Sequence, residues 1–132
     1  MSRAPKPPAP TDAELDVLRV LWDRGPSTVR EVHEAVTSDR AVGYTTVLKQ
    51  MQVMQRKGLL TRSERFRSHV YEAAQPRADV QRTLVQILMR QAFSGSARGL
   101  LQSALGGRRV SAVELDEIRR LLDQMGGKGG KR

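Results

Sequence analysis

The 132-residue sequence contains no cysteine and only five aromatic side chains. The lack of cysteine excludes disulfide bonds, thiolate metal sites and cysteine nucleophiles, and it is typical of a cytosolic protein. The two histidines, His33 and His69, lie far apart in the chain, and neither has a cluster of other metal ligands around it. We therefore expect no metal, no cofactor and only a modest core.

Long apolar runs are also missing from the sequence. None approaches the roughly 18 residues that a membrane-spanning helix needs, and residues 1–10 lack the apolar stretch of a secretory signal. There is no Ser/His/Asp arrangement, and the glycines from Gly126 onward follow a helix and precede nothing, so they form no phosphate-holding loop. These absences predict a cytoplasmic protein that has no membrane partner and is not an enzyme.

Acidic residues are scarce relative to basic ones, and the net charge is +9. The two signs are sorted along the chain. Residues 40–69 hold seven Lys/Arg and one acid, whereas residues 11–36 hold three Lys/Arg and six acids. This sorting favours a nucleic-acid-binding face over charge spread for general solubility.

A helix is predicted over residues 44–57, because Val47, Met51 and Met54 recur at positions i, i+4 and i+7. Its other face has no carboxylate and carries Thr45, Thr46, Lys49, Gln50 and Arg56. In a DNA major groove, short hydroxyls suit phosphates and thymine methyls, and longer donors suit base edges. An ordinary amphipathic surface helix has the same pattern, so this helix alone leaves both readings open.

A short hairpin is predicted directly after this helix. Residues 59–63 and 69–73 are strand-like, and the tip at residues 64–68 is polar and basic. A recognition-type helix followed by glycine and a basic two-stranded ribbon is the order of a winged helix. Arginines near the tip of such a wing suit the phosphate backbone, which makes Arg62, Arg65 and Arg67 candidate phosphate contacts.

Two further helices are predicted ahead of this segment, and each opens with a capping box. The boxes are Thr11-x-x-Glu14 and Thr28-x-x-Glu31. The predicted apolar positions are Leu15, Leu18, Leu21 and Trp22 in the first helix and Val29, Val32 and Val36 in the second. Free amides at a helix N-terminus bind phosphate oxygens, so Ser27, Thr28 and Arg30 are either phosphate contacts or only part of the helix cap.

The predicted fold is mainly α with a small β-hairpin. We expect a disordered N-terminal arm at residues 1–10, a winged helix-turn-helix domain at 11–75, a helical dimerisation region at 76–125 and a disordered basic tail at 126–132. The helices of the third segment bury little surface alone, so they either pack back on the winged helix or pair with a second copy. The residues expected in a homodimer interface are Leu84, Ile87, Leu88, Leu100, Leu101, Leu105, Leu115, Ile118 and Leu122.

The sequence resembles the penicillinase-repressor (BlaI/MecI-like) family of bacterial transcription factors over about residues 11–125. The similarity rests on Glu14-Leu15-x-Val17-Leu18-x-x-Leu21-Trp22, Gly25-Pro26-Ser27-Thr28-Val29-Arg30-Glu31-Val32, Tyr44-Thr45-Thr46-Val47, Lys57-Gly58-Leu59-Leu60 and His69-x-Tyr71. It implies a homodimeric repressor on a palindromic operator in double-stranded DNA. By position it assigns base contacts to Thr45, Thr46 and Lys49. It assigns phosphate contacts to Tyr44, Ser27, Thr28, Arg62, Arg65 and Arg67.

The resemblance also names a membrane sensor protease as a candidate partner. In well-known members of the family such a protease cuts an Asn-Phe bond in the dimerisation region. The corresponding positions here are Ser103 and Ala104, so that junction is absent. A copper-responsive branch of the family uses C-terminal cysteines, which this chain lacks.

Three functional hypotheses follow from the sequence. The leading one is a dimeric, sequence-specific repressor. The second is a winged-helix regulator that senses a small ligand between its DNA-binding and dimer regions. The third is a non-specific basic nucleic-acid-binding protein, which would show no preference for a palindrome.

Overall fold

The computed structural model describes residues 9–38, 41–65, 67–107 and 109–129, with side chains as far as residue 126. The predicted N-terminal arm therefore lies almost entirely outside the described residues, as do residues 130–132 of the predicted tail. The chain divides into two compact units between Gln86 and Ile87.

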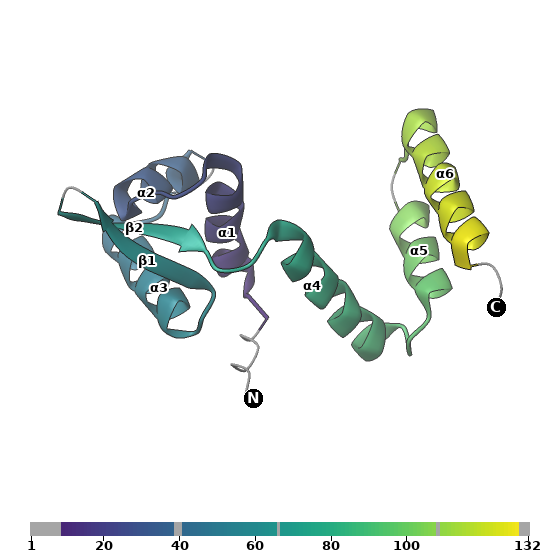
Figure 1. Ribbon diagram of the computed structural model, residues 1–132, viewed down its shortest axis with the longest axis horizontal. Coiled ribbons are helices and arrows are strands. Elements are labelled where there is room, and N and C mark those ends of the chain that lie inside the picture. The colour runs from purple at the N-terminus through teal and green to yellow at the C-terminus, as the bar shows by residue number, and fades with distance from the viewer. Residues whose placement is uncertain (1–8, 39–40, 66, 108, 130–132) are drawn as a thin grey trace. The chain divides into compact units, whose positions relative to one another are not determined.

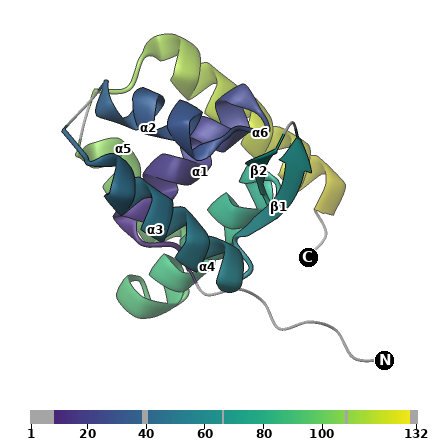
Figure 2. The ribbon, with the colours of Figure 1, turned by 90° about the vertical axis from the view of Figure 1, so that its left-hand side faces the viewer.

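The first unit contains three helices and a hairpin (Figure 1), which confirms the predicted fold class. Its elements are α1 (Asp12–Arg24), α2 (Val29–Thr37), α3 (Tyr44–Arg56), β1 (Leu60–Arg65), β2 (Ser68–Ala73) and the first part of α4 (Arg77–Ala92). In the turned view of Figure 2, α3 faces the viewer and leads into the hairpin at one edge of the helices.

Both predicted capping boxes are confirmed. The Thr11 hydroxyl accepts from the Glu14 amide at 3.2 Å, and the Glu14 carboxylate accepts from the Thr11 amide at 3.0 Å. Thr28 and Glu31 make the same two bonds at 3.2 and 2.9 Å. Each box satisfies backbone donors that a helix start otherwise leaves open, so the starts of α1 and α2 are fixed by local sequence.

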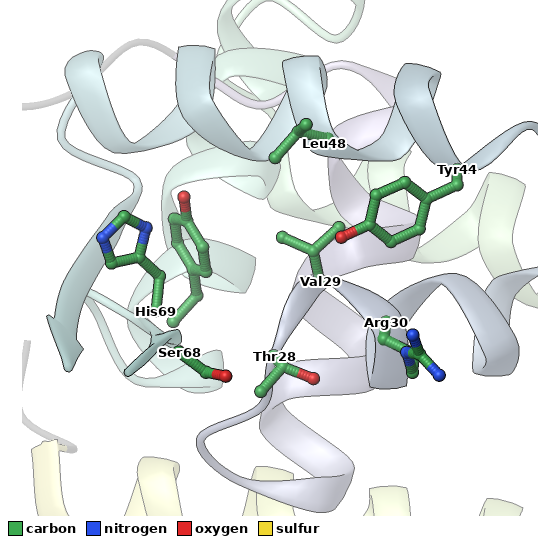
Figure 3. Close-up of a pocket in the computed structure, with 8 residues that line it drawn as sticks. Thr28, Val29, Arg30, Tyr44, Leu48, Ser68 and His69 are labelled. Carbon is green, nitrogen blue, oxygen red and sulfur yellow. The ribbon is translucent and has the colours of Figure 1, made fainter. Parts of the chain in front are cut away.

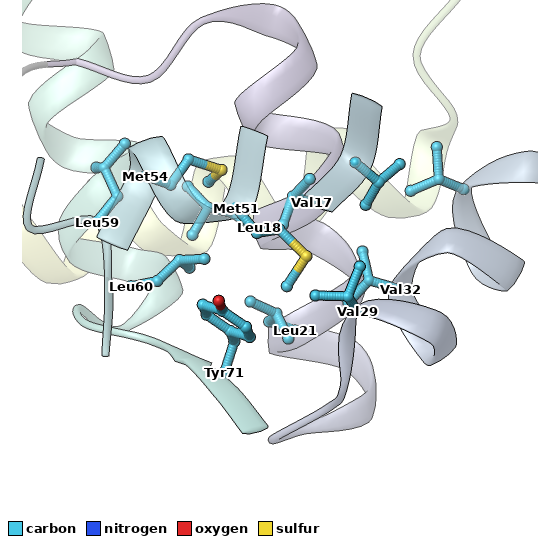
Figure 4. Close-up of a cluster of buried hydrophobic side chains, with 12 residues drawn as sticks. Val17, Leu18, Leu21, Val29, Val32, Met51, Met54, Leu59, Leu60 and Tyr71 are labelled. Carbon is cyan, nitrogen blue, oxygen red and sulfur yellow. The ribbon is translucent and has the colours of Figure 1, made fainter. Parts of the chain in front are cut away.

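The core of the first unit lies between the three helices and the hairpin (Figure 4). All predicted apolar positions of α2 and α3 are buried there. On α1 the prediction was partly wrong, because Val17 is buried with Leu18 and Leu21, whereas Leu15 and Trp22 are only partly buried. Apolar residues are so frequent on α1 that periodicity alone could not decide which ones face α2 and α3.

The hairpin is longer than predicted and its turn is tighter. Leu60 pairs with Ala73 at one end, and Arg65 pairs with Ser68 at the other. The turn lies between Arg65 and Ser68, and residue 66 is outside the described residues. Arg67 has a φ of 65°, and two-residue hairpin turns require such left-handed backbone. The positive φ therefore lets the ladder extend to Arg65.

The hairpin is also tied to the loop before α2. Tyr71 and Ser27 exchange two backbone hydrogen bonds, of 2.9 and 2.8 Å, on the side of β2 that β1 leaves free. Tyr71 itself is buried in the core. The start of α2 and the second strand of the wing are therefore held together by backbone bonds as well as by packing.

A buried ion pair joins the start of α1 to the end of α3. Glu14 is 4% exposed, and its Oε2 lies 2.6 Å from Nζ of Lys57. Burial acts to raise the pKa of Glu14, but the hydrogen bond and charge of Lys57 and the bonds from Thr11 outweigh it and lower that pKa below 4.5. Glu14 therefore stays ionised at neutral pH and serves both as helix cap and as ion-pair partner.

The second unit is helical. It contains the end of α4, then α5 (Ala97–Gly106) and α6 (Ala112–Gly129). No side chain that the structure describes from Ile87 onward is buried. The prediction of a disordered tail over residues 126–132 was wrong in part, because α6 continues to Gly129. Each glycine in a helix costs only about 1 kcal/mol relative to alanine, so a helix already formed upstream can run on through them.

Candidate nucleic-acid interface

The face of α3 that points away from the core carries the predicted base-reading residues. Thr45, Thr46 and Lys49 are exposed, while Gln50 is only partly exposed. The core side of the same helix holds Val47, Met51 and Met54. Because α3 contains no Asp or Glu, nothing on its own surface repels a phosphate backbone. This face can enter a major groove and present two hydroxyls and an ammonium.

A cleft of about 490 Å³ lies beside this face, between α2, α3 and the wing (Figure 3). Three of the predicted phosphate contacts, Thr28, Arg30 and Tyr44, line it together. The remaining lining residues are Val29, Leu48, Ser68, His69 and Tyr71. The rim thus offers hydroxyls, a guanidinium and an imidazole, which are donors that DNA phosphates accept from. The cleft therefore brings residues of α2, α3 and β2 together at one place on the surface.

Ser68 and His69 were missed by the sequence reasoning, which treated the hairpin mainly through its arginines. Both line the cleft, and His69 Nε2 lies 3.8 Å from Glu64 Oε2 across the hairpin. One signal could have found His69. Because strand residues two apart point to the same face, His69 lies on the same face as the buried Tyr71.

Ser27 does not belong to this surface. It is 2% exposed, its hydroxyl donates to the Gly25 carbonyl at 2.9 Å, and its backbone is paired with Tyr71. A side chain buried in this way cannot reach a phosphate, so this predicted contact is corrected. Of the three candidates at the start of α2, Thr28 both caps the helix and lines the cleft, and Arg30 lines the cleft without capping.

The wing arginines Arg62, Arg65 and Arg67 are all exposed. Arg62 pairs with Tyr71 and shares its face of the hairpin, whereas Arg65 lies on the opposite face next to the turn. Arg67 is in the turn itself. The three guanidinium groups are therefore spread over both faces and the tip of the wing, which suits contact along a backbone more than capture of one phosphate.

We expect Arg67→Ala to weaken binding to every DNA sequence by a few-fold and to reduce the slope of log affinity against log salt by about 0.9, the value for one neutralised phosphate. A titration at four or more salt concentrations measures both quantities. Arg19→Ala is the matched control, because Arg19 is ion-paired with Asp16 on α1. An unchanged salt slope in Arg67→Ala would remove this residue from the phosphate contacts.

All the residues predicted for the dimer interface are at least partly open to solvent in the single chain. Leu88, Leu101 and Leu122 are exposed, and none of the others is buried. The partly buried ones are Leu84, Ile87, Leu100, Leu105, Leu115 and Ile118. An apolar set of this size that is left open to solvent is a feature of interaction surfaces.

Among the described residues, no group of three or more His, Asp or Glu side chains could hold a metal ion. In the same part of the chain, no helix combines the length and the apolar character needed to cross a membrane.

Three helices, a wing and a carboxylate-free face on the third helix define a winged-helix transcriptional regulator. The chain belongs to the penicillinase repressor family, whose model matches residues 10–124. This is a family of repressors and not of enzymes.

Several known proteins resemble the chain over most of its length. It is 35% identical to the transcriptional regulator BlaI of two Mycobacterium tuberculosis strains over 123 residues, which cover 92% of this chain and 88% of the relative. It is 21% identical to the penicillinase repressor of Bacillus licheniformis over 119 residues, 90% of this chain and 93% of that one. The crystal structure of a transcriptional regulator from Thermotoga maritima matches with a TM-score of 0.52 at 22% identity, covering 92% of this chain and 80% of the other. That last likeness supports the fold alone.

Proposed function

We propose that this protein is a sequence-specific DNA-binding repressor that acts in the cytoplasm as a homodimer on a palindromic operator. The observation that carries the proposal is a cleft lined jointly by α2, α3 and the wing, with hydroxyl, guanidinium and imidazole groups on it, beside a helix α3 that contains no carboxylate. Residues 11–75 bind DNA in this proposal, and residues 76–125 form the dimer. Repression follows because a bound dimer occupies promoter DNA.

Each part of the surface has its own role. Thr45, Thr46 and Lys49 read base edges in the major groove, with Gln50 at the border of the face. Thr28, Arg30 and Tyr44 bind phosphates at the cleft, and Arg62, Arg65 and Arg67 bind phosphates along the wing. Phosphate contacts hold the helix in register, and base contacts distinguish the operator from other DNA.

The open leucines of the C-terminal helices support the homodimer. Leu101 lies on α5 and Leu122 on α6, and both are exposed in the single chain. A second copy presents the same apolar faces, and two-fold pairing is the commonest way for such faces to be covered. A two-fold dimer also presents two α3 helices to two half-sites, which is why we expect a palindrome.

A gel-shift titration on DNA from the protein's own upstream region, competed with unrelated DNA at fixed salt, tests the proposal. A complex that survives a large excess of competitor and protects a palindrome is the expected result. Loss of the complex at equal competitor would leave only the third hypothesis, a non-specific basic protein.

We expect Thr46→Ala to weaken operator binding about tenfold, within the usual range for one base contact, while leaving binding to unrelated DNA unchanged. Competition titrations on both DNAs measure the two affinities. Thr61→Ala is the matched control, because Thr61 is exposed at the base of the hairpin, opposite the carboxylate-bearing Glu72. Equal loss on both DNAs would show that Thr46 does not read a base.

One observation favours the second hypothesis, a ligand-responsive regulator. An open surface pocket of about 390 Å³ lies in the first unit, beside the segment that joins β2 to α4. It is lined by Leu21, Trp22, Gly25, Pro26, Glu72, Ala73, Ala74, Gln75 and Pro76. A compound that binds in this pocket would raise the melting temperature of the protein, and a compound that binds more tightly would raise it further. Thermal shifts with candidate effectors, followed by gel shifts with any that bind, test this reading.

A further inference from the structure

The start of α4 is tied to the end of α1 by three contacts. The indole nitrogen of Trp22 donates to the Gln75 carbonyl at 3.1 Å. The guanidinium of Arg77 lies 2.7 Å from the Asp23 carboxylate and 5.4 Å from the centre of the Trp22 ring. We call Trp22, Asp23, Gln75 and Arg77 the α1–α4 clasp.

The clasp holds the first turn of α4 from more than one direction. The indole bond fixes the chain just before Pro76, whose carbonyl accepts from the amides of Asp79 and Val80 and so begins the helix. Val80 is buried one turn further on. Arg77 then binds a charge and a ring that both belong to α1. Because these contacts fall on one short stretch, α4 cannot swing at its start without breaking several of them.

We infer that the α1–α4 clasp sets the direction in which α4 leaves the DNA-binding unit, and through it the spacing between half-sites that a dimer accepts. The inference rests on the proposed function, because half-site spacing has meaning only for a dimer on a palindrome. Helix α4 carries Leu84, Ile87 and Leu88 of the proposed dimer interface. Within the first unit, a fixed start to α4 therefore fixes where Leu84 lies relative to the recognition helix α3.

The clasp is separable from the stability of the core. Asp23 and Arg77 are exposed, and neither belongs to the core cluster. Exposed ion pairs contribute little to folding, so removing either partner leaves a folded domain. Asp23 and Arg77 are accordingly positioning residues, with no base or phosphate contact assigned to them.

A spin-label distance measurement tests the clasp without DNA. Because the chain has no cysteine, Glu34→Cys on α2 and Gln86→Cys on α4 introduce the only two thiols, at exposed positions. The labelled chain is diluted with unlabelled protein so that distances within one chain dominate. We expect a narrow distribution in the parent and one at least about twofold broader in Arg77→Ala and Asp23→Ala.

Arg82→Ala is the matched control for this measurement and for the DNA experiment described next. Arg82 is also exposed on α4, but its partner Asp79 belongs to the same helix, at 3.3 Å. The substitution removes the same charge as Arg77→Ala without touching α1. We expect its distance distribution to equal that of the parent.

Operator spacing tests the consequence on DNA. Each inserted base pair turns one half-site by about 34°, given 10–10.5 base pairs per turn, so a rigid dimer should lose affinity when one or two are added. We expect Arg77→Ala and Asp23→Ala to reduce that spacing penalty about fivefold, and Arg82→Ala to keep it. The two clasp variants change net charge in opposite directions, so a shared effect cannot come from charge.

The outcomes separate the inference from the proposed function. A parent protein that binds a palindrome and a single half-site equally well would refute the dimeric repressor, and the spin labels would still decide whether the clasp holds α4. Clasp variants that keep a narrow distance distribution, or that keep the parent's spacing penalty, would overturn the inference while leaving the repressor intact.

Discussion

Replacing Leu122 with aspartate is expected to weaken operator binding by at least about 100-fold, because a monomer loses the gain from two linked half-sites. Leu122 is 51% exposed on α6, so the substitution places a charge in the proposed interface without disturbing a buried position. Analytical ultracentrifugation should show the parent as a dimer and the variant as a monomer at the same concentration. Binding to a single half-site should change far less than binding to the palindrome.

Val113→Asp is the matched control for this experiment. Val113 lies on the same helix and is 68% exposed, but nine positions from Leu122, which places it on the opposite face of α6. It adds the same charge and should leave both the dimer and operator binding unchanged. A dimeric Leu122→Asp variant with full operator affinity would show that this face of α6 is not part of the interface.

Lys57→Ala is expected to lower the free energy of unfolding by about 2–3 kcal/mol, since it leaves the Glu14 carboxylate buried without its ion-pair partner. The value lies below the usual cost of breaking a buried pair because the Lys57 side chain is 32% exposed and the Thr11 amide still binds Glu14. For a domain of this size the melting temperature should fall by about 10–15 °C. Calorimetry on both proteins measures the difference.

The pH dependence of this effect has a definite sign. The pKa of Glu14 is lower in the folded protein than its ordinary value of 4.5, so the ion pair stabilises the fold fully above about pH 4.5 and less as pH falls through the folded pKa. The gap between the parent and Lys57→Ala should therefore narrow below pH 4.5. Arg56→Ala, an exposed neighbour on α3, should show neither the large loss nor this narrowing. A gap that stays constant down to pH 3 would refute the role of Glu14 ionisation.

The parts of the fold that local sequence decides were the ones predicted well. Thr11 and Thr28 cap their helices through residues three positions away, and the apolar faces of α2 and α3 repeat at helical spacing. Such signals need no knowledge of the rest of the chain. The residues of α1 that face inward were harder to predict, because α2 and α3 decide which of its many apolar positions they cover.

The candidate site shows the same division between local and long-range information. The polar residues of α3 can be found from the periodicity of that one helix. Thr45, Thr46 and Lys49 are exposed as expected, whereas Gln50 is only partly exposed. The cleft brings residues near position 28 together with residues near position 69. A contact between such distant positions cannot be predicted from a local sequence pattern. Ser27 was misplaced for the same reason, since its burial comes from the backbone bonds to Tyr71. The length of the hairpin was missed because it depends on the left-handed backbone at Arg67.

The absence of buried side chains among the described residues from Ile87 onward has a consequence for how such a repressor responds to its own abundance. If these helices gain their packing only from a second copy, then ordering and association are one reaction, and the amount of active protein depends on concentration. While most chains are single, halving their number lowers the amount of dimer about fourfold by mass action. When synthesis or dilution by cell growth changes the number of chains, the amount of dimer on the controlled genes would then change by a larger factor than the number of chains does.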